Sequence, residues 1–387
     1  MPFEVLRPSD LRRRSGLKWQ HYGPDVLPLW VAEMDVLPAP EVVAALTAAI
    51  RSGDTGYPGA GRRYAEALAE FAQQRWGLVV EPARSVQCAD VMTGIRVLVE
   101  RITEPGGTVV IPSPVYPPFA GFSRELGRRV VPVPLTSQGR LDLPSIGEAL
   151  AQVPPREVPV VLLCSPHNPT GVVHTRAELV ELARLSDEYG AQVVADEVHA
   201  PLVPAGVAFE SWLSVAENGF VVTSAAKGFN LAGLKAGLIV AAPGSTGLLR
   251  RLPESVSYGS SHLGVIGHAA AYRAAPQWLD AVNANIVENR TLLSALLAER
   301  LPGIGCLTPD ATYLAWLDCS GLGLGEDPAH VFLEGGAVAL TSGVAFGPGG
   351  AGHARINLAC SREVLTEAVD RMATAVAWAQ KSSPVGF

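Results

Sequence analysis

Four polar side chains, far apart in the chain, have the types and the order that one kind of chemistry requires. They are Asn168, Asp196, Lys227 and Arg355, the last of which follows a glycine-rich stretch at 343–352. A lysine amine can hold an aldehyde, a carboxylate can pair with a ring nitrogen, and a guanidinium can bind a carboxylate through two hydrogen bonds. This set predicts a pyridoxal 5'-phosphate enzyme that acts on an amino acid.

Lys227 is the residue on which this prediction depends. It follows a predicted strand at 220–224, within the stretch Ser-Ala-Ala-Lys-Gly-Phe-Asn. Ligands of open α/β sheets gather beyond the carboxyl ends of strands, and an apolar setting there lowers a lysine pKa and favours a Schiff base. Lys235 is the competing lysine, and a solvated surface amine is the alternative for either. Ser224 is expected to place its hydroxyl on the cofactor phosphate.

Asp196 and Asn168 are expected to bind the cofactor ring. Asp196 follows a predicted strand at 192–195, where its carboxylate can keep the ring nitrogen protonated, so that the ring withdraws electrons from the substrate Cα. Asn168 lies in the loop Pro-His-Asn-Pro-Thr-Gly, which its prolines and glycine constrain, and its amide can donate to the phenolate oxygen. The alternatives are a strand-end turn or helix cap for Asp196 and a plain turn for Asn168.

The phosphate and the face of the ring need further contacts. Helix N-termini bind phosphate, and the backbone amides of Gly94 and Ile95, near the start of a helical run, are the candidates for this role. Tyr116, in a proline-rich turn, is expected to stack on the ring and to join Lys227 and Asp196 in catalysis. A core aromatic residue is the alternative for Tyr116.

The elements that must position these residues alternate between short apolar runs and stretches of helical period. This pattern predicts an α/β domain with a mostly parallel sheet between helices. The clearest helix is 175–189, and the last hundred residues predict a smaller α+β domain with helices 276–301 and 362–380. The predicted strands of the large sheet are 108–112, 129–134, 159–164, 192–195, 220–224 and 236–241, and those of the smaller domain are 312–317 and 354–358.

The composition limits the class of protein. The chain has 387 residues, 48% of them hydrophobic and 17% charged, which predicts a compact soluble protein. The net charge of −7 argues against binding nucleic acid. Five scattered cysteines without metal-ligand spacing predict a reduced, cytoplasmic protein with no metal site. No signal peptide is expected, and no apolar run reaches the roughly 20 residues of a membrane helix.

The chain resembles the fold-type-I pyridoxal phosphate enzymes of the aminotransferase class I/II superfamily, and within it the cystathionine β-lyase-like C–S lyases. The resemblance extends over nearly the whole chain and implies a large domain with a seven-stranded sheet. We expect an N-terminal arm at 1–41 that joins the small domain, a large domain at 42–283 and a small C-terminal domain at 284–387. The matching segments are W-V-A-E-M-D at 30–35, with Glu33 for the usual Asp, P-H-N-P-T-G at 166–171, D-E-V-H at 196–199, K-G-F-N at 227–230 and R-I-N at 355–357.

The resemblance also implies a homodimer with shared active sites. Gly56-Tyr57-Pro58 resembles the segment whose tyrosine reaches the cofactor phosphate of the neighbouring subunit, so Tyr57 is expected to act across the interface. His199, three residues after Asp196, is expected at the cofactor, where typical transaminases carry tyrosine and the C–S lyases carry histidine. Drift within the transaminase branch is the alternative explanation for this histidine.

Three functions follow from these residues. The first is β-elimination of L-cystathionine or another cysteine S-conjugate to pyruvate, ammonia and a thiol, with Lys227 as the general base. The second is an aminotransferase, which would use the same Lys227, Asp196 and Arg355. The third is a pyridoxal phosphate-binding regulator, which the acidic charge and the lack of a helix-turn-helix before residue 30 disfavour. The expected partners are an amino-acid substrate and a second copy of the chain, with no nucleic acid and no membrane.

Overall fold

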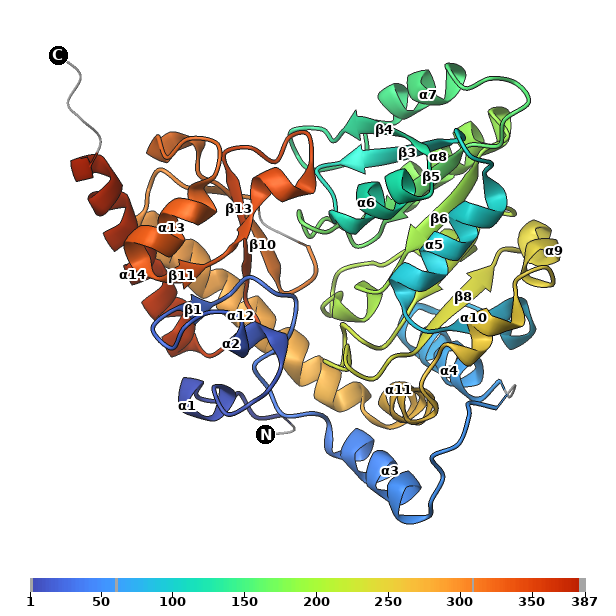
Figure 1. Ribbon diagram of the computed structural model, residues 1–387, viewed down its shortest axis with the longest axis horizontal. Helices are drawn as coiled ribbons and strands as arrows, with labels where there is room; N and C mark the ends of the chain where they lie inside the picture. Colours follow the sequence, from blue (N-terminus) through green and yellow to red (C-terminus); the bar gives the residue numbers. More distant parts are fainter. Residues whose placement is uncertain (1–2, 60–61, 308–309, 383–387) are drawn as a thin grey trace.

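The structure is a computed structural model that describes residues 3–59, 62–307 and 310–382. A seven-stranded sheet lies between helices in the larger part, and a four-stranded sheet forms the centre of the smaller part (Figure 1). The long helix α12 (Pro276–Arg300) runs from one part into the other (Figure 1). Within the described ranges, no helix combines the length and apolar character of a membrane span.

The large sheet confirms the expected parallel core. Its strand order is β2-β8-β7-β6-β5-β3-β4, in which β4, β3, β5, β6 and β7 are parallel and β8 is antiparallel to both neighbours. Six of the strands lie where the sequence predicts them, and β2 is additional. The bounds are β2 Ser85–Cys88, β3 Thr108–Ser113, β4 Arg129–Pro134, β5 Val160–Cys164, β6 Gln192–Asp196, β7 Phe220–Thr223 and β8 Gly237–Ala241.

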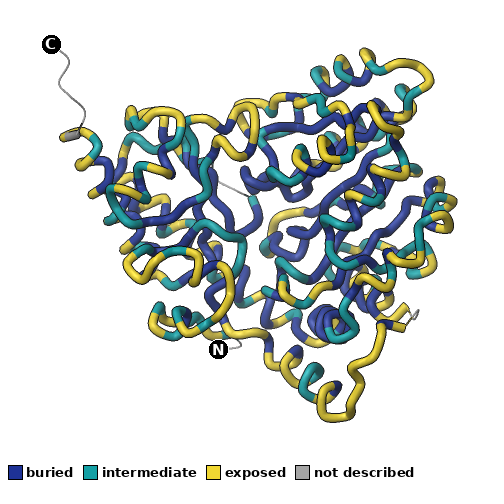
Figure 2. Tube along the Cα trace, viewed as in Figure 1, coloured by how far each residue is buried: buried dark blue, intermediate teal, exposed yellow. Residues whose placement is uncertain are grey.

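Both faces of this sheet are covered because its strands are apolar on both sides. Along β5, Val160 and Leu162 pack into one hydrophobic cluster and Val161 and Leu163 pack into another, as the alternation of a strand requires. Figure 2 shows these central strands as buried. The first cluster includes residues of α5 (Val91–Ile102) and α6 (Pro118–Glu125), and the second those of α7 (Leu143–Ala151) and α8 (Arg176–Glu188).

Helix α8 begins where the sequence predicts it. Thr175 and Glu178 form a capping box, in which each side chain accepts from the other residue's backbone N–H, which satisfies two amide groups at the helix start. A third cluster, around Tyr64, Phe71 and Tyr272, packs three more helices on the β8 end of the sheet. These are α3 (Pro40–Arg51), α4 (Arg63–Trp76) and α11 (His262–Ala274), while the short α9 (Thr246–Leu249) and α10 (Glu254–Tyr258) follow β8 in the chain.

The smaller part joins the two ends of the chain. Strand β1 (Leu27–Pro28) pairs in parallel with β11 (Val338–Ala339), so the N-terminal segment packs beside C-terminal elements. The four-stranded antiparallel sheet has the order β12-β13-β10-β9. Its strands are β9 Gly305–Cys306, β10 Leu314–Asp318, β12 Thr341–Ser342 and β13 His353–Asn357, and the helices of this part are α1 Pro8–Leu11, α2 Leu17–Gln20, α13 Pro328–Gly336 and α14 Arg362–Ser382.

Helix α12 belongs to both parts. Trp278 and Ile286, in its first half, pack in the cluster around Tyr64, whereas Leu293 and Leu297 pack in the cluster of the smaller part. We propose that the domain boundary lies inside this helix, with 1–41 and 284–387 in the small domain and 42–283 in the large one.

Candidate active site

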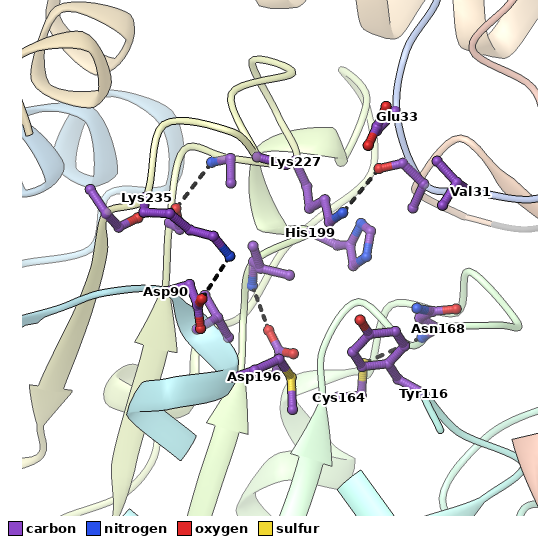
Figure 3. Close-up of a pocket in the computed structure, with 18 of the residues that line it drawn as sticks. Val31, Glu33, Asp90, Tyr116, Cys164, Asn168, Asp196, His199, Lys227 and Lys235 are labelled. Carbon is purple, nitrogen blue, oxygen red and sulfur yellow. Dashed lines mark hydrogen bonds and ion pairs between the residues drawn. The ribbon is translucent and has the colours of Figure 1, made fainter. Parts of the chain in front are cut away.

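The carboxyl ends of the parallel strands bring the predicted residues together. Because β3, β5, β6 and β7 are parallel, the segments that follow them meet at one edge of the sheet. There they line a pocket with a cavity of about 370 Å³. Figure 3 shows the labelled side chains converging on it. The predicted residues in its wall are Tyr116, Asn168, Asp196, His199, Ser224, Lys227 and Arg355.

The Lys227 amine is held by the chain's N-terminal segment. Its Nζ donates to the carbonyl oxygen of Ala32 at 2.9 Å, and the Tyr313 hydroxyl donates to the same oxygen at 3.0 Å. Burial, followed by the charge of Arg355, lowers the pKa of Lys227 to about 8. About a tenth of this amine is therefore neutral at pH 7, far more than for an exposed lysine, and the neutral form is the nucleophile for an aldehyde.

Asp196 is a buried carboxylate whose charge has little compensation within the chain. Its Oδ1 accepts from the backbone N–H of Val198 at 3.0 Å. Burial raises the pKa of Asp196 to about 7, although this hydrogen bond and the Lys227 charge oppose the shift. A cationic ring N–H beside this carboxylate would restore its ionised form. The site therefore fits a pyridine nitrogen.

His199 is buried in the wall of the same pocket and stays neutral. Burial, and then the charges of Lys227 and Arg355, lower its pKa to about 3. Its Nδ1 has no hydrogen-bond partner among the described residues. The neutral imidazole therefore adds a polar group to the pocket wall without adding a charge.

Arg355 and Asn168 form a connected pair. One Arg355 nitrogen donates to Asn168 Oδ1 at 2.9 Å, and the other terminal nitrogen donates to the Trp30 carbonyl at 2.9 Å. Burial lowers the Arg355 pKa to about 10, so the guanidinium remains charged. Because the Asn168 oxygen already accepts from Arg355, its NH₂ group is left as the donor for a ring oxygen.

Tyr116 and Ser224 also reach the pocket. The Tyr116 ring is half-buried in its wall, and burial raises the pKa of its hydroxyl. The Ser224 hydroxyl donates to the Ala236 carbonyl at 2.7 Å and accepts from the Ala226 amide at 3.1 Å. A phosphate at Ser224 would therefore compete with the bond to Ala236.

The predicted amides of Gly94 and Ile95 do not line the pocket. Helix α5 starts at Val91 with Asp90 as its cap, so the Gly94 N–H already donates to the Asp90 carbonyl at 3.0 Å, within the helix. Ile95 is fully buried in the core. The pocket is lined instead by Asp90, Val91 and Met92, because the unpaired amides of a helix lie in its first turn.

Lys235, which the sequence presents only as a competitor of Lys227, also lines the pocket. Its ammonium lies at the pocket and forms an ion pair with Asp90 at 2.8 Å. It therefore places a positive charge at the N-terminus of α5, where a phosphate would be stabilised. The signal in the sequence is a single charge after the apolar turn Leu-Ala-Gly-Leu at 231–234.

Tyr57 lies outside this pocket. Its side chain is 88% exposed on the loop after α3. Nothing in a single chain brings it to the site, so its role across an interface stays a prediction.

Comparisons with known proteins agree with this geometry. The family model for aminotransferase class I and II matches residues 24–372. A Mycobacterium tuberculosis protein named "Putative cystathionine beta-lyase" is 48% identical over 96% of this chain and 97% of its own. The cystathionine beta-lyase of Corynebacterium glutamicum is 34% identical over 95% of this chain and 98% of its own.

Solved structures are similar over nearly their whole length. The crystal structure of "a putative plp-dependent beta-cystathionase" from Corynebacterium diphtheriae has a TM-score of 0.89 and 34% identity, and the match covers 97% of this chain and 99% of that one. The family match spans most of the chain, including every residue of the pocket. The chain belongs to the aminotransferase class I and II family.

Proposed function

We propose that this protein is a pyridoxal phosphate-dependent C–S lyase. It eliminates a thiol from L-cystathionine or a related cysteine thioether and forms pyruvate and ammonia. The observation that carries this proposal is the Lys227 amine, with a pKa of about 8, in one pocket with a buried carboxylate and a buried guanidinium. The names of the most similar relatives support elimination as the reaction.

The residues present fit the cofactor. When bound, pyridoxal phosphate supplies an electron sink for negative charge at the substrate Cα. The Lys227 amine would hold the aldehyde, Asp196 the ring nitrogen and the Asn168 amide the ring oxygen, with Tyr116 and His199 beside the ring. The phosphate would lie at the first turn of α5, near Val91, Met92, Ser224 and Lys235.

The reaction uses the same side chains in sequence. Arg355 binds the substrate α-carboxylate and fixes the direction of the Cα–H bond. With the substrate amine held at the cofactor, the Lys227 amine would be free to remove the Cα proton as a general base. The Cβ–S bond then breaks and the sulfur leaves as a thiolate. Water completes the conversion of the remaining three-carbon unit to pyruvate and ammonia.

An aminotransferase would use the same residues, and the family model is named for that activity. His199 favours the lyase, because it stands where the resemblance places tyrosine in typical transaminases. Purified holoenzyme with L-cystathionine should release pyruvate, and Lys227→Ala should release none. Conversion of the cofactor to its pyridoxamine form, without pyruvate from any cysteine thioether, would identify an aminotransferase.

We also propose a homodimer in which Tyr57 binds the cofactor phosphate of the partner subunit. Four exposed apolar residues on α3 and its flanking loops support an interface there: Leu37, Val43, Ile50 and Tyr57. Five unpaired cysteines support a reducing, cytoplasmic location.

A subunit-mixing experiment tests Tyr57. Tyr57→Ala and Lys227→Ala proteins should each be nearly inactive alone. If Tyr57 acts across the interface, a heterodimer has one site with both defects and one intact site. Denaturing and refolding an equal mixture should then restore about a quarter of wild-type activity. No recovery in a mixture that contains heterodimers would place Tyr57 in its own subunit's site, and a Tyr57→Ala protein that is active alone would place Tyr57 outside both sites.

A further inference from the structure

A six-residue segment, 30–35, crosses the pocket and is fixed along its backbone. We call it the strap. Each of its first five carbonyl oxygens accepts a side-chain hydrogen bond, so its position relative to Lys227 and Arg355 is strongly determined. The donors are Arg355 and Thr341 to Trp30, Asn357 to Val31, Lys227 and Tyr313 to Ala32, Lys18 and Asn357 to Glu33, and Asn230 to Met34.

The end of the strap is anchored by a buried ion pair. Asp35 lies 2.9 Å from the Lys18 ammonium, and these side chains are 1% and 2% exposed. Trp19 Nε1 donates to the other Asp35 oxygen at 2.8 Å. The strap is therefore a rigid wall of the pocket. The backbone position from which each of its side chains extends is fixed.

Glu33 carries the acidic side chain of the strap that lines the pocket. Lys18 and Asn357 bond only its backbone oxygen, and no described residue makes a hydrogen bond or ion pair with its carboxylate. Figure 3 shows Glu33 beside Lys227. Burial and Arg355 lower the pKa of Lys227, and the Glu33 charge opposes that shift. With the Lys227 amine bound to the cofactor aldehyde, the Glu33 carboxylate would lack a fixed cation among the described residues.

The other charges already have partners in the proposed reaction. Arg355 binds the substrate α-carboxylate, Asp196 the ring nitrogen and Lys235 the phosphate. The α-amine of the substrate would bind to the cofactor aldehyde. A second cation on the substrate would therefore find one unpaired carboxylate, that of Glu33.

We propose that Glu33 selects thioethers whose thiol portion carries an ammonium group. This inference rests on the proposed lyase function and adds the substrate class. In L-cystathionine an ammonium lies three carbons beyond sulfur. A charge-assisted hydrogen bond to Glu33 would hold that end of the substrate while Arg355 holds the other. Glutamate also reaches one methylene further into the pocket than the aspartate of the lyases that this strap resembles.

A matched pair of substrates tests the proposal in the holoenzyme. S-(3-aminopropyl)-L-cysteine and S-butyl-L-cysteine have chains of equal length beyond sulfur, and only the first carries a distal ammonium. The wild type should prefer the amine by about tenfold in kcat/KM. Glu33→Gln should lose this preference by slowing only the amine. Glu104→Gln, which removes an exposed carboxylate at the opposite edge of the sheet, should retain it.

The outcomes separate this inference from the proposed function. Cofactor absorbance and melting temperature establish that Glu33→Gln is folded and loaded. An equal loss of kcat/KM for both thioethers, or no loss for either, would overturn the role of Glu33 while leaving the lyase intact. Failure of the wild type to release pyruvate from either thioether or from L-cystathionine would overturn the lyase function, and this inference with it.

Discussion

At the scale of single residues, the pKa of Lys227 should control how fast the cofactor is captured. Only the neutral amine attacks an aldehyde, and the amine has a pKa of about 8 in the folded protein. The rate at which cofactor-free protein captures pyridoxal phosphate should rise about tenfold per pH unit well below pH 8 and level off above it.

Stopped-flow absorbance after mixing with excess cofactor measures this rate between pH 6 and 9.5. An exposed lysine would instead show a rate that still rises at pH 9.5, since its pKa would lie near 10.4. That result would contradict the desolvation of Lys227.

The sequence predicts the site residues that act through the chemical type of their side chains. It predicts less well the contacts that backbone atoms make. Asn168, Asp196, Lys227 and Arg355 come together as predicted, because each follows or lies in a strand of recognisable pattern. The Ala32 carbonyl that holds Lys227 has no signature in the sequence, and only the fold brings residue 32 to residue 227. Which backbone amides would face the phosphate depends on the residue at which α5 starts. The Asp90 cap determines that residue.

At the scale of elements, the strap should depend on the Lys18–Asp35 ion pair. Both side chains are almost fully buried, so removing one charge leaves the other without compensation. Lys18→Met or Asp35→Asn should lower the free energy of unfolding by about 3–5 kcal/mol. Urea unfolding followed by tryptophan fluorescence measures the loss.

The double substitution is the control for that prediction. Lys18→Met with Asp35→Leu removes both charges and should restore part of the lost stability, because no unpaired buried charge remains. If the single substitutions cost as little as an exposed ion pair, about 0–1 kcal/mol, the strap is held mainly by its backbone hydrogen bonds.

The strands that the sequence does not predict are short, with two to four residues each. Strand β2 is half-buried at the sheet edge, so it lacks the continuous apolar run of the central strands. Strands β1 and β11 have two residues each and pair across some three hundred positions. No local period can reveal such strands, because each exists only through its distant partner.

At the scale of the whole molecule, stability should depend on pH through Glu197, which follows Asp196 but points away from the pocket. Its carboxylate accepts from the Ser211 hydroxyl and the Trp212 amide. Burial raises the pKa of Glu197 to about 8 from an ordinary value of 4.5. The folded state therefore binds a proton that the unfolded state has released between pH 4.5 and pH 8.

The sign of the effect follows from that difference. Stability from Glu197 is fully present below pH 4.5 and is lost as the pH rises toward 8, since the unfolded state binds fewer protons. Glu197→Gln has no proton to lose, so it should become more stable relative to the wild type by a few kcal/mol between pH 5 and pH 8. Urea unfolding of both proteins across this range measures the difference in stability. The contributions of the buried histidines and Asp196 are present in both proteins, so they cancel to first order. A difference that does not change with pH would mean that Glu197 is ionised in the folded protein, with its charge stabilised by Ser211 and Trp212.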